Sequence, residues 1–277
     1  MCTRSIHKIG THQEWLSERT SQQAFFDTSG LLFAASAALT IAWCGSMSTM
    51  AKMPMPGGWA MSMTWMRMPG QTWIEATASF LAMWIVMMAA TMLPSLVPML
   101  AHFRKAVGWA GESRLGRLTA LAGLGYFFVW TLFGVAVFPL GVALSTVEMD
   151  IPALARAIPF AVGAVIFLAG AIQFTSWKAH HLASCRKAPR HGRRSSADAS
   201  SAWRQEVRFG FHCSLSCANL TAILLVMGVM DLRAMAALTA TITLERLPPA
   251  GKLVARTIGS VIIGAGLLLI VNAVRLG

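Results

Sequence analysis

Charged residues are scarce in this sequence of 277 residues. Only 12% are Asp, Glu, Lys or Arg, and 56% are hydrophobic, whereas a soluble domain is about one-quarter charged. This deficit excludes an ordinary soluble domain. The 11 acidic residues include none in the middle of a long apolar stretch, so there is no intramembrane carboxylate pair for proton transfer. A glycine-rich phosphate loop and a nucleophile elbow, which mark common enzyme classes, are also missing.

Cysteine is limited to five residues, an odd number, and most of them lie in or beside apolar stretches. Such a set does not indicate a framework of disulfides. If Cys185, Cys213 and Cys217 face the cytoplasm, we expect them to stay reduced and free to bind a metal.

Long uncharged stretches indicate transmembrane helices, because a helix needs about 20 apolar residues to cross a bilayer. We therefore predict an all-α, polytopic membrane helix bundle of about seven transmembrane helices. The predicted helices are 29–45, 74–101, 118–144, 156–177, 208–230, 232–247 and 256–274. The sixth has an uncharged core of only residues 234–244. It spans the bilayer only if Arg233 extends outward and Glu245 with Arg246 marks the opposite boundary.

The net charge of +12 is better explained by membrane orientation than by nucleic-acid binding. Most of the 23 Lys and Arg residues fall in segments that are cytoplasmic if the N-terminus is cytoplasmic, as the positive-inside rule requires. Residues 1–28 are then a cytoplasmic arm, and residues 29–277 are one membrane domain with a Met-rich outer loop, 46–72, and a basic inner loop, 178–207. We expect a multi-pass protein of the bacterial inner membrane. Its partners are expected to include bilayer lipid but not nucleic acid.

Soft metal ligands lie on both sides of the inner loop. Two groups of three are present: His180, His181 and Cys185 at the end of one predicted helix, and His212, Cys213 and Cys217 near the start of the next. Thiolate and imidazole suit copper and zinc, and residues four apart share a helical face. We predict a cytoplasmic-side site for copper or zinc whose ligands are His181, Cys185, Cys213 and Cys217, with His180 and His212 as further ligands or hydrogen-bond donors. The alternative is that the cysteines are small core residues and the histidines polar interfacial residues.

The outer loop is rich in methionine. Its Met-x-Met pairs make six candidate ligands for copper: Met53, Met55, Met61, Met63, Met66 and Met68. Thioethers bind Cu(I) without deprotonation. The alternative is an amphipathic loop on the membrane surface, where methionine and tryptophan are flexible apolar contacts. Methionines at 83, 87, 88 and 92 continue this pattern along the second helix, either as a thioether path or as core residues beside Pro94 and Pro98.

Several short runs occur together between Trp73 and the C-terminus: Met83-Trp84 through Met92-Leu93-Pro94-Ser95 with Pro98, Gly125-Tyr126 with Trp130 and Phe133-Gly134, Lys178 to Cys185-Arg186, Gly210 to Cys217, and Gly228-Val229-Met230 to Glu245-Arg246-Leu247. With these runs the sequence resembles an uncharacterised bacterial family of predicted metal-binding integral membrane proteins. The resemblance implies metal binding but supplies no reaction. The family usually has Cys at the position of His181, His at that of Phe209, and further Cys and Trp at those of Ser216 and Ala218.

The favoured function is copper or zinc handling. This means binding the ion, delivering it between a donor and an acceptor protein, or transporting it. One alternative is a non-transporting accessory subunit in which the metal joins helices. Another is a thiol-redox membrane protein that uses Cys213 and Cys217, although cysteines four apart on a helix have poorly directed Cβ vectors for a disulfide.

Overall fold

The computed structural model describes residues 3–48, 53–54, 60–61, 65, 67, 70–107, 112–186, 199–246 and 251–276. Within this part the chain forms eight helices and one pair of two-residue strands. In order they are α1 Thr3–Ser48, β1 Met53–Pro54, β2 Ala60–Met61, α2 Trp73–Val107, α3 Glu112–Asp150, α4 Pro152–Ile172, α5 Ser176–Arg186, α6 Ala199–Met227, α7 Leu232–Arg246 and α8 Gly251–Leu276. The predicted helical architecture is confirmed.

Five helices in the described ranges are long and apolar enough to cross a membrane. Their candidate spans are Arg19–Ser46, Trp73–Lys105, Ser113–Val147, Glu206–Met227 and Leu253–Arg275. A sixth exists if Ala157–Ile172 and Ser176–Cys185 are counted as one broken span. The 15-residue α7, which is the sixth predicted helix, is not among them, so its span and the total of seven stay predictions. The boundary of the cytoplasmic arm at residue 28 is also still a prediction, and α1 passes through it without interruption.

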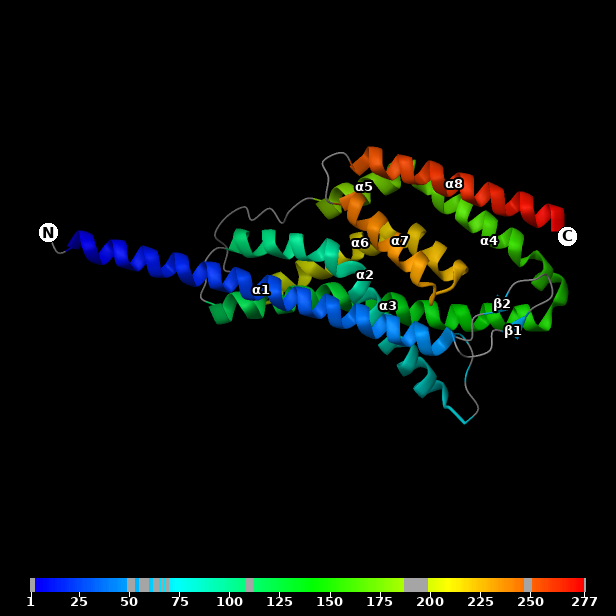
Figure 1. Ribbon diagram of the computed structural model, residues 1–277, viewed down its shortest axis with the longest axis horizontal. Helices are drawn as coiled ribbons and strands as arrows, with labels where there is room; N and C mark the ends of the chain where they lie inside the picture. The colour runs from blue at the N-terminus through cyan, green and yellow to red at the C-terminus, as the bar shows by residue number, and fades with distance from the viewer. Residues whose placement is uncertain are drawn as a thin grey trace.

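Helices α1, α2, α3 and α6 enclose the main core. The N-terminal part of α1 extends beyond the other helices, and the two chain ends lie at opposite ends of the molecule (Figure 1). Trp84 on α2 and Trp130 on α3 are fully buried, and the Trp84 indole Nε1 donates a hydrogen bond of 2.9 Å to the Trp130 carbonyl. The Trp84 ring occupies the place of a side chain at Gly134, where a Cβ would lie 2.6 Å from it.

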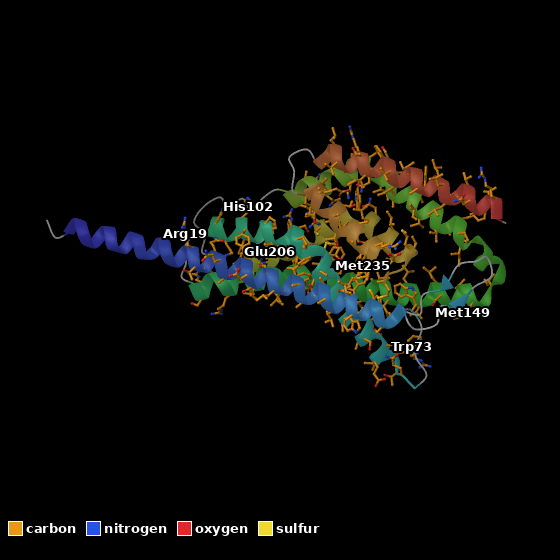
Figure 2. The ribbon with its side chains drawn as sticks, viewed as in Figure 1. Arg19, Trp73, His102, Met149, Glu206 and Met235 are labelled. Carbon is orange, nitrogen blue, oxygen red and sulfur yellow. The ribbon has the colours of Figure 1, made fainter. Side chains whose placement is uncertain are left out.

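Helix α2 crosses the length of this core. Its first turn has a capping box, in which the Thr72 backbone N–H donates to the Glu75 carboxylate at 2.8 Å and the Glu75 N–H donates to the Thr72 hydroxyl at 3.3 Å, a pattern that stabilises a helix start. Trp73 and His102 mark its opposite ends (Figure 2).

The predicted helix 156–177 is interrupted near its end, because α4 ends at Ile172 and α5 begins at Ser176. The chain bends by 67° between α4 and α5, and the Thr175 hydroxyl accepts the Lys178 backbone N–H at 3.3 Å at the start of α5. A threonine hydroxyl in this place offers the backbone a partner that competes with a continuous helix. His180, His181 and Cys185 therefore lie on a separate helix that begins after the bend, and not at the end of α4.

A tight turn returns the chain from α6 to α7. Gly228 has a φ of +118°, a backbone conformation that is unfavourable for residues with a Cβ atom. Asp231 then accepts the backbone N–H groups of Arg233 at 2.8 Å and Ala234 at 3.0 Å through its Oδ1, which is an N-cap. Because α7 contacts both α6 and α2 after this turn, its last residue, Arg246, reaches the middle of α6.

Helices α4 and α8 pack closely at one side of the molecule (Figure 1). Gly163 and Gly170 on α4 face α8, and a Cβ on Gly170 would lie 2.8 Å from the Ile263 backbone nitrogen. Small residues in such places let membrane helices approach each other closely.

We expect Gly170→Val to destabilise the protein by about 1–3 kcal/mol, because the backbone of α8 must move to admit the side chain. Thermal unfolding of the detergent-solubilised protein measures this. Gly264→Ala on α8 is the matched control, since a Cβ there has no atom within 4 Å. A Gly170→Val protein as stable as the Gly264→Ala protein would contradict the close packing.

The two strands lie in the Met-rich segment and pair Met53 with Met61 in antiparallel register. The other four candidate methionines, Met55, Met63, Met66 and Met68, lie outside the described residues, as does the middle of the basic inner loop, residues 187–198. Copper capture by the outer methionines therefore stays a prediction.

Candidate metal centre

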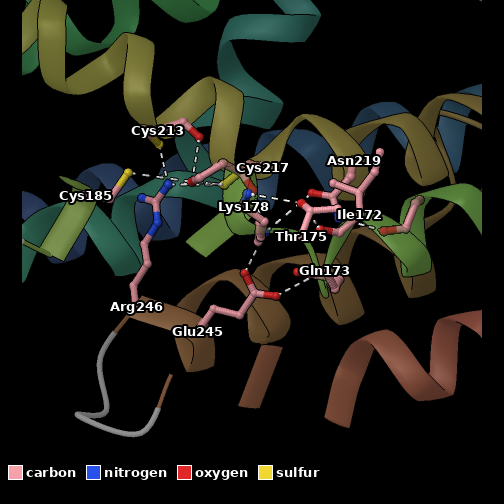
Figure 3. A network of polar contacts seen from close by, with 12 residues as sticks. Ile172, Gln173, Thr175, Lys178, Cys185, Cys213, Cys217, Asn219, Glu245 and Arg246 are labelled. Carbon is pink, nitrogen blue, oxygen red and sulfur yellow. Dashed lines mark hydrogen bonds and ion pairs between the residues drawn. The ribbon is translucent and has the colours of Figure 1, made fainter. Parts of the chain in front are cut away.

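Cys213 and Cys217 lie one turn apart on α6, and both are buried, with 0% and 1% of their surface exposed. Residues four apart share a helical face, and this face is turned toward the end of α7. The guanidinium of Arg246 reaches both thiols: its Nη2 donates to Cys213 Sγ and, at 3.2 Å, to Cys217 Sγ (Figure 3).

Arg246 also joins these thiols to α2. Its Nη1 donates a 2.9 Å hydrogen bond to the Ser95 hydroxyl, so one guanidinium connects α2, α6 and α7. Among the described residues, no carboxylate forms an ion pair with Arg246. Its positive charge is therefore directed at sulfur, and a cation beside a thiol favours the thiolate.

Cys185 approaches from α5 and is also buried. Its Sγ lies 3.6 Å from the hydroxyl of Ser216, which lies 3.7 Å from Cys217 Sγ. The same hydroxyl donates to the Cys213 carbonyl at 3.0 Å. Ser216 thus stands between Cys185 and the two thiols of α6.

Tyr126 completes the surroundings of Cys213 from α3. Its hydroxyl lies 2.7 Å from Cys213 Sγ, and its ring is fully buried. A hydroxyl that donates to sulfur stabilises a thiolate in the same way that hydrogen bonds stabilise other anions. Cys213 therefore has two hydrogen-bond partners, the charged Arg246 guanidinium and the neutral Tyr126 hydroxyl.

A buried ion pair lies next to this group. Lys178 Nζ is 2.9 Å from Glu245 Oε2, and the two side chains are 1% and 2% exposed. Lys178 also donates to the Ser216 carbonyl at 2.5 Å, and Gln173 Nε2 donates to Glu245 Oε1 at 2.8 Å (Figure 3). Buried ions are tolerated when paired and hydrogen-bonded. This pair holds α5 against α6 and α7.

The histidines form a separate group. His181 Nδ1 on α5 lies 3.1 Å from His212 Nδ1 on α6, and His180 is exposed with its ring centre 5.5 Å from that of His181. In the described residues, no three side chains of His, Cys, Asp or Glu are grouped so that they could hold one metal ion. The structure thus brings Cys213 and Cys217 to one guanidinium with Cys185 beside them, and pairs His181 with His212.

The donors gathered in this centre are thiols, and soft sulfur ligands select Cu(I). Two of them, Cys213 and Cys217, are buried on one face of α6.

The charge distribution predicts that Lys178 and Arg246 lie in cytoplasmic segments and that Glu245 with Arg246 marks a membrane boundary, and both stay predictions. Within the structure the Lys178 and Glu245 side chains are buried and pair with each other, and Arg246 bonds to the thiols of α6. The available signal was their position in the runs that carry the family resemblance, which also contain Tyr126 and Ser216.

A comparison with protein families agrees with this chemistry. The profile of a family described as PpoB2 copper chaperones matches residues 81–269, which include every residue of the thiol centre. No curated protein and no solved structure matches the chain. The matched segment covers most of the sequence and includes α3 to α7 in full. The chain therefore belongs to the PpoB2 copper chaperone family.

Proposed function

We propose that this chain is a membrane-embedded copper chaperone that holds Cu(I) between the thiolates of Cys213 and Cys217. The observation that carries the proposal is the arrangement of these two buried thiols one turn apart, both hydrogen-bonded to Arg246. Thiolates are soft ligands that select Cu(I). The family description names copper as the cargo.

The charges around the centre support a monovalent ion. Two thiolates with one Cu(I) carry a single negative charge, which the Arg246 guanidinium balances. Lys178 and Glu245 balance each other. Zn²⁺ between the same two thiolates would form a neutral unit and leave the guanidinium uncompensated, and an uncompensated buried charge is strongly unfavourable. Charge balance therefore favours copper over the zinc alternative.

Cys185 is the thiol through which copper leaves in this proposal. It is the only one of the three thiols that comes from α5, and it is separated from Cys217 by the Ser216 hydroxyl. A third thiol allows Cu(I) to pass from one pair of sulfurs to another without being released into water. His181 and His212, which join the same two helices, are proposed accessory ligands on this route.

We place the centre in the cytoplasmic half of the bacterial inner membrane, with the N-terminus in the cytoplasm. The candidate spans support a bilayer location, and the distribution of Lys and Arg supports the orientation. Cys213 lies seven residues inside the span Glu206–Met227, or about 10 Å along the helix axis. The partners are then lipid and a protein that donates or accepts copper.

Copper content of the purified full-length protein tests the proposal. Cys213→Ser/Cys217→Ser is expected to lose one equivalent of Cu(I) relative to the wild type, because hydroxyl oxygen is a poor ligand for soft ions. The measurement is elemental analysis after anaerobic loading and competition with a Cu(I) chelator. Cys2→Ser is the matched control, and it should retain the wild-type copper content.

Equal copper content in the double variant and the wild type would refute the site. Circular dichroism and thermal unfolding of each variant separate loss of metal from loss of fold. A disulfide between Cys213 and Cys217 trapped from cells would favour the thiol-redox alternative instead.

A further inference from the structure

A second group of sulfur atoms lies apart from the thiol centre. Helices α1, α2 and α7 and the turn after α6 enclose a small cavity whose lining includes Trp43, Cys44, Met83, Met87, Met230 and Met235. The Cys44 thiol donates to the Met230 thioether, with 3.7 Å between Sγ and Sδ. Cys44, Met87 and Met235 are buried, and Met235 is labelled in Figure 2.

Composition does not explain this convergence. The chain has 18 Met and 5 Cys among 277 residues, fewer than one residue in ten, yet every lining residue except Thr40 and Trp43 carries sulfur. These sulfur atoms come from four separate segments, so neighbourhood along the chain does not bring them together either. A flexible apolar core would be filled equally well by leucine.

The chemistry of the cavity suits Cu(I). Thioethers bind Cu(I) without losing a proton, and a single thiolate adds one negative charge. Cu(I) with the Cys44 thiolate and neutral thioethers is therefore uncharged overall. Such a unit needs no balancing cation, and the lining residues include none. The thiol centre differs here, since it has two thiolates and Arg246.

Helices α2 and α7 each carry residues of both this cavity and the thiol centre, at different positions along the helix axis. On α2, Met87 lines the cavity and Ser95 binds Arg246, which is a separation of about 12 Å along the axis. On α7, Met235 and Arg246 are about 16 Å apart by the same rise. Met88 and Met92, which are fully buried, lie between the two levels on α2.

The cavity also adjoins the Met-rich segment. Cys44 is four residues before the end of α1, where that segment begins. Trp65, one of the described residues within it, packs on Phe80 with 5.4 Å between ring centres, and Phe80 precedes Met83 by one turn of α2. Among the described residues, the sulfur cavity is therefore a buried soft-ligand group close to the segment 46–72 along both α1 and α2.

We infer that Cys44, Met83, Met87, Met230 and Met235 form a second Cu(I) site, which receives copper on the side of the Met-rich segment before it reaches the thiol centre. This inference rests on the proposed function, because it assumes that Cu(I) is the cargo. In this inference, copper enters through the methionine thioethers of the cavity. It leaves through the thiols of Cys185, Cys213 and Cys217.

Copper stoichiometry separates the two sites. Under anaerobic loading with Cu(I), the wild type is expected to bind two equivalents, Cys213→Ser/Cys217→Ser one, and Met83→Leu/Met230→Leu one. A protein with all four substitutions is expected to bind none. Leucine preserves the apolar volume of methionine, so the fold should be retained. Cys44→Ser is expected to weaken the second equivalent at least tenfold, because it removes the anionic ligand.

Met88→Leu/Met92→Leu is the matched control, since these methionines lie on α2 and do not line the cavity, and it should keep two equivalents. Met87→Leu/Met235→Leu is an independent pair for the cavity and should also lose one. A wild type that binds a single Cu(I), lost in the cysteine variant, would overturn the second site and leave the proposed function standing. Copper that persists in the cysteine variant at the wild-type level would instead overturn the proposed function.

Discussion

Arg246→Leu is expected to weaken Cu(I) binding by roughly 100-fold while leaving the metal-free protein at least as stable as the wild type. In the copper-bound state the guanidinium balances an anionic dithiolate complex, and removal of one member of a buried charge pair costs about 3 kcal/mol or more. Each factor of ten in affinity corresponds to about 1.4 kcal/mol. Without copper and with neutral thiols, the guanidinium has no anionic partner among the described residues, so its loss relieves the cost of an unpaired buried cation.

Chelator competition measures the affinity, and thermal unfolding of the metal-free protein measures the stability. Arg246→Lys should fall between wild type and Arg246→Leu, because an ammonium keeps the charge but cannot span Cys213, Cys217 and Ser95 with a rigid fork. Arg233→Leu is the control on the same helix, where Arg233 is exposed. Wild-type copper affinity in Arg246→Leu would show that the guanidinium does not balance the complex.

Glu245→Gln is expected to be the most destabilising single substitution near the centre, at about 3–5 kcal/mol. It leaves the Lys178 ammonium buried without an anionic partner, beside neutral acceptors such as the Ser216 carbonyl and the Asn219 amide oxygen. The double variant Lys178→Met/Glu245→Leu should recover most of the loss, because replacement of a whole buried pair by apolar groups of similar size is often neutral.

Unfolding of the metal-free, detergent-solubilised variants measures this difference. Asp150→Asn removes an exposed carboxylate at the end of α3 and should change the free energy of unfolding by no more than about 0.5 kcal/mol. If Glu245→Gln and Asp150→Asn were equally stable, the Lys178–Glu245 pair would not hold α5 in place.

Most of the helices could be predicted from the sequence because their signal is local. Residues 76–102, 118–146 and 209–230 are long and uncharged, and each is helical in the structure apart from the turn that begins at Gly228. The bend between α4 and α5 is not predicted, because the local apolar pattern continues through it unchanged. Residues 157–177 are equally uncharged, and the bend lies beside the local contact of Thr175 with Lys178 and the pairing of Lys178 with Glu245, which is 67 residues away.

The centre could be predicted only in part. Spacing alone shows that Cys213 and Cys217 share a face, and consecutive helices suggested that Cys185 approaches them. Nothing local shows that Arg246, 29 residues after Cys217, turns inward to both thiols. The positive-inside rule treats Lys and Arg as loop residues, so it does not predict a cation that bonds to buried sulfur. The pairing of His181 with His212 depends equally on the angle at which α5 meets α6.

The bend before α5 has a mechanical consequence for copper release. Because Lys178 is only seven residues before Cys185 on the same short helix, any swing of α5 that carries Cys185 outward also pulls the ammonium away from Glu245 and from the Ser216 carbonyl. Cys185 and Lys178 therefore move together, because both lie on the short helix α5. If copper leaves by the proposed route, a receiving protein is therefore expected to offer a replacement acidic group as well as a sulfur ligand, and a small thiol in solution, which offers only sulfur, should unload the protein slowly.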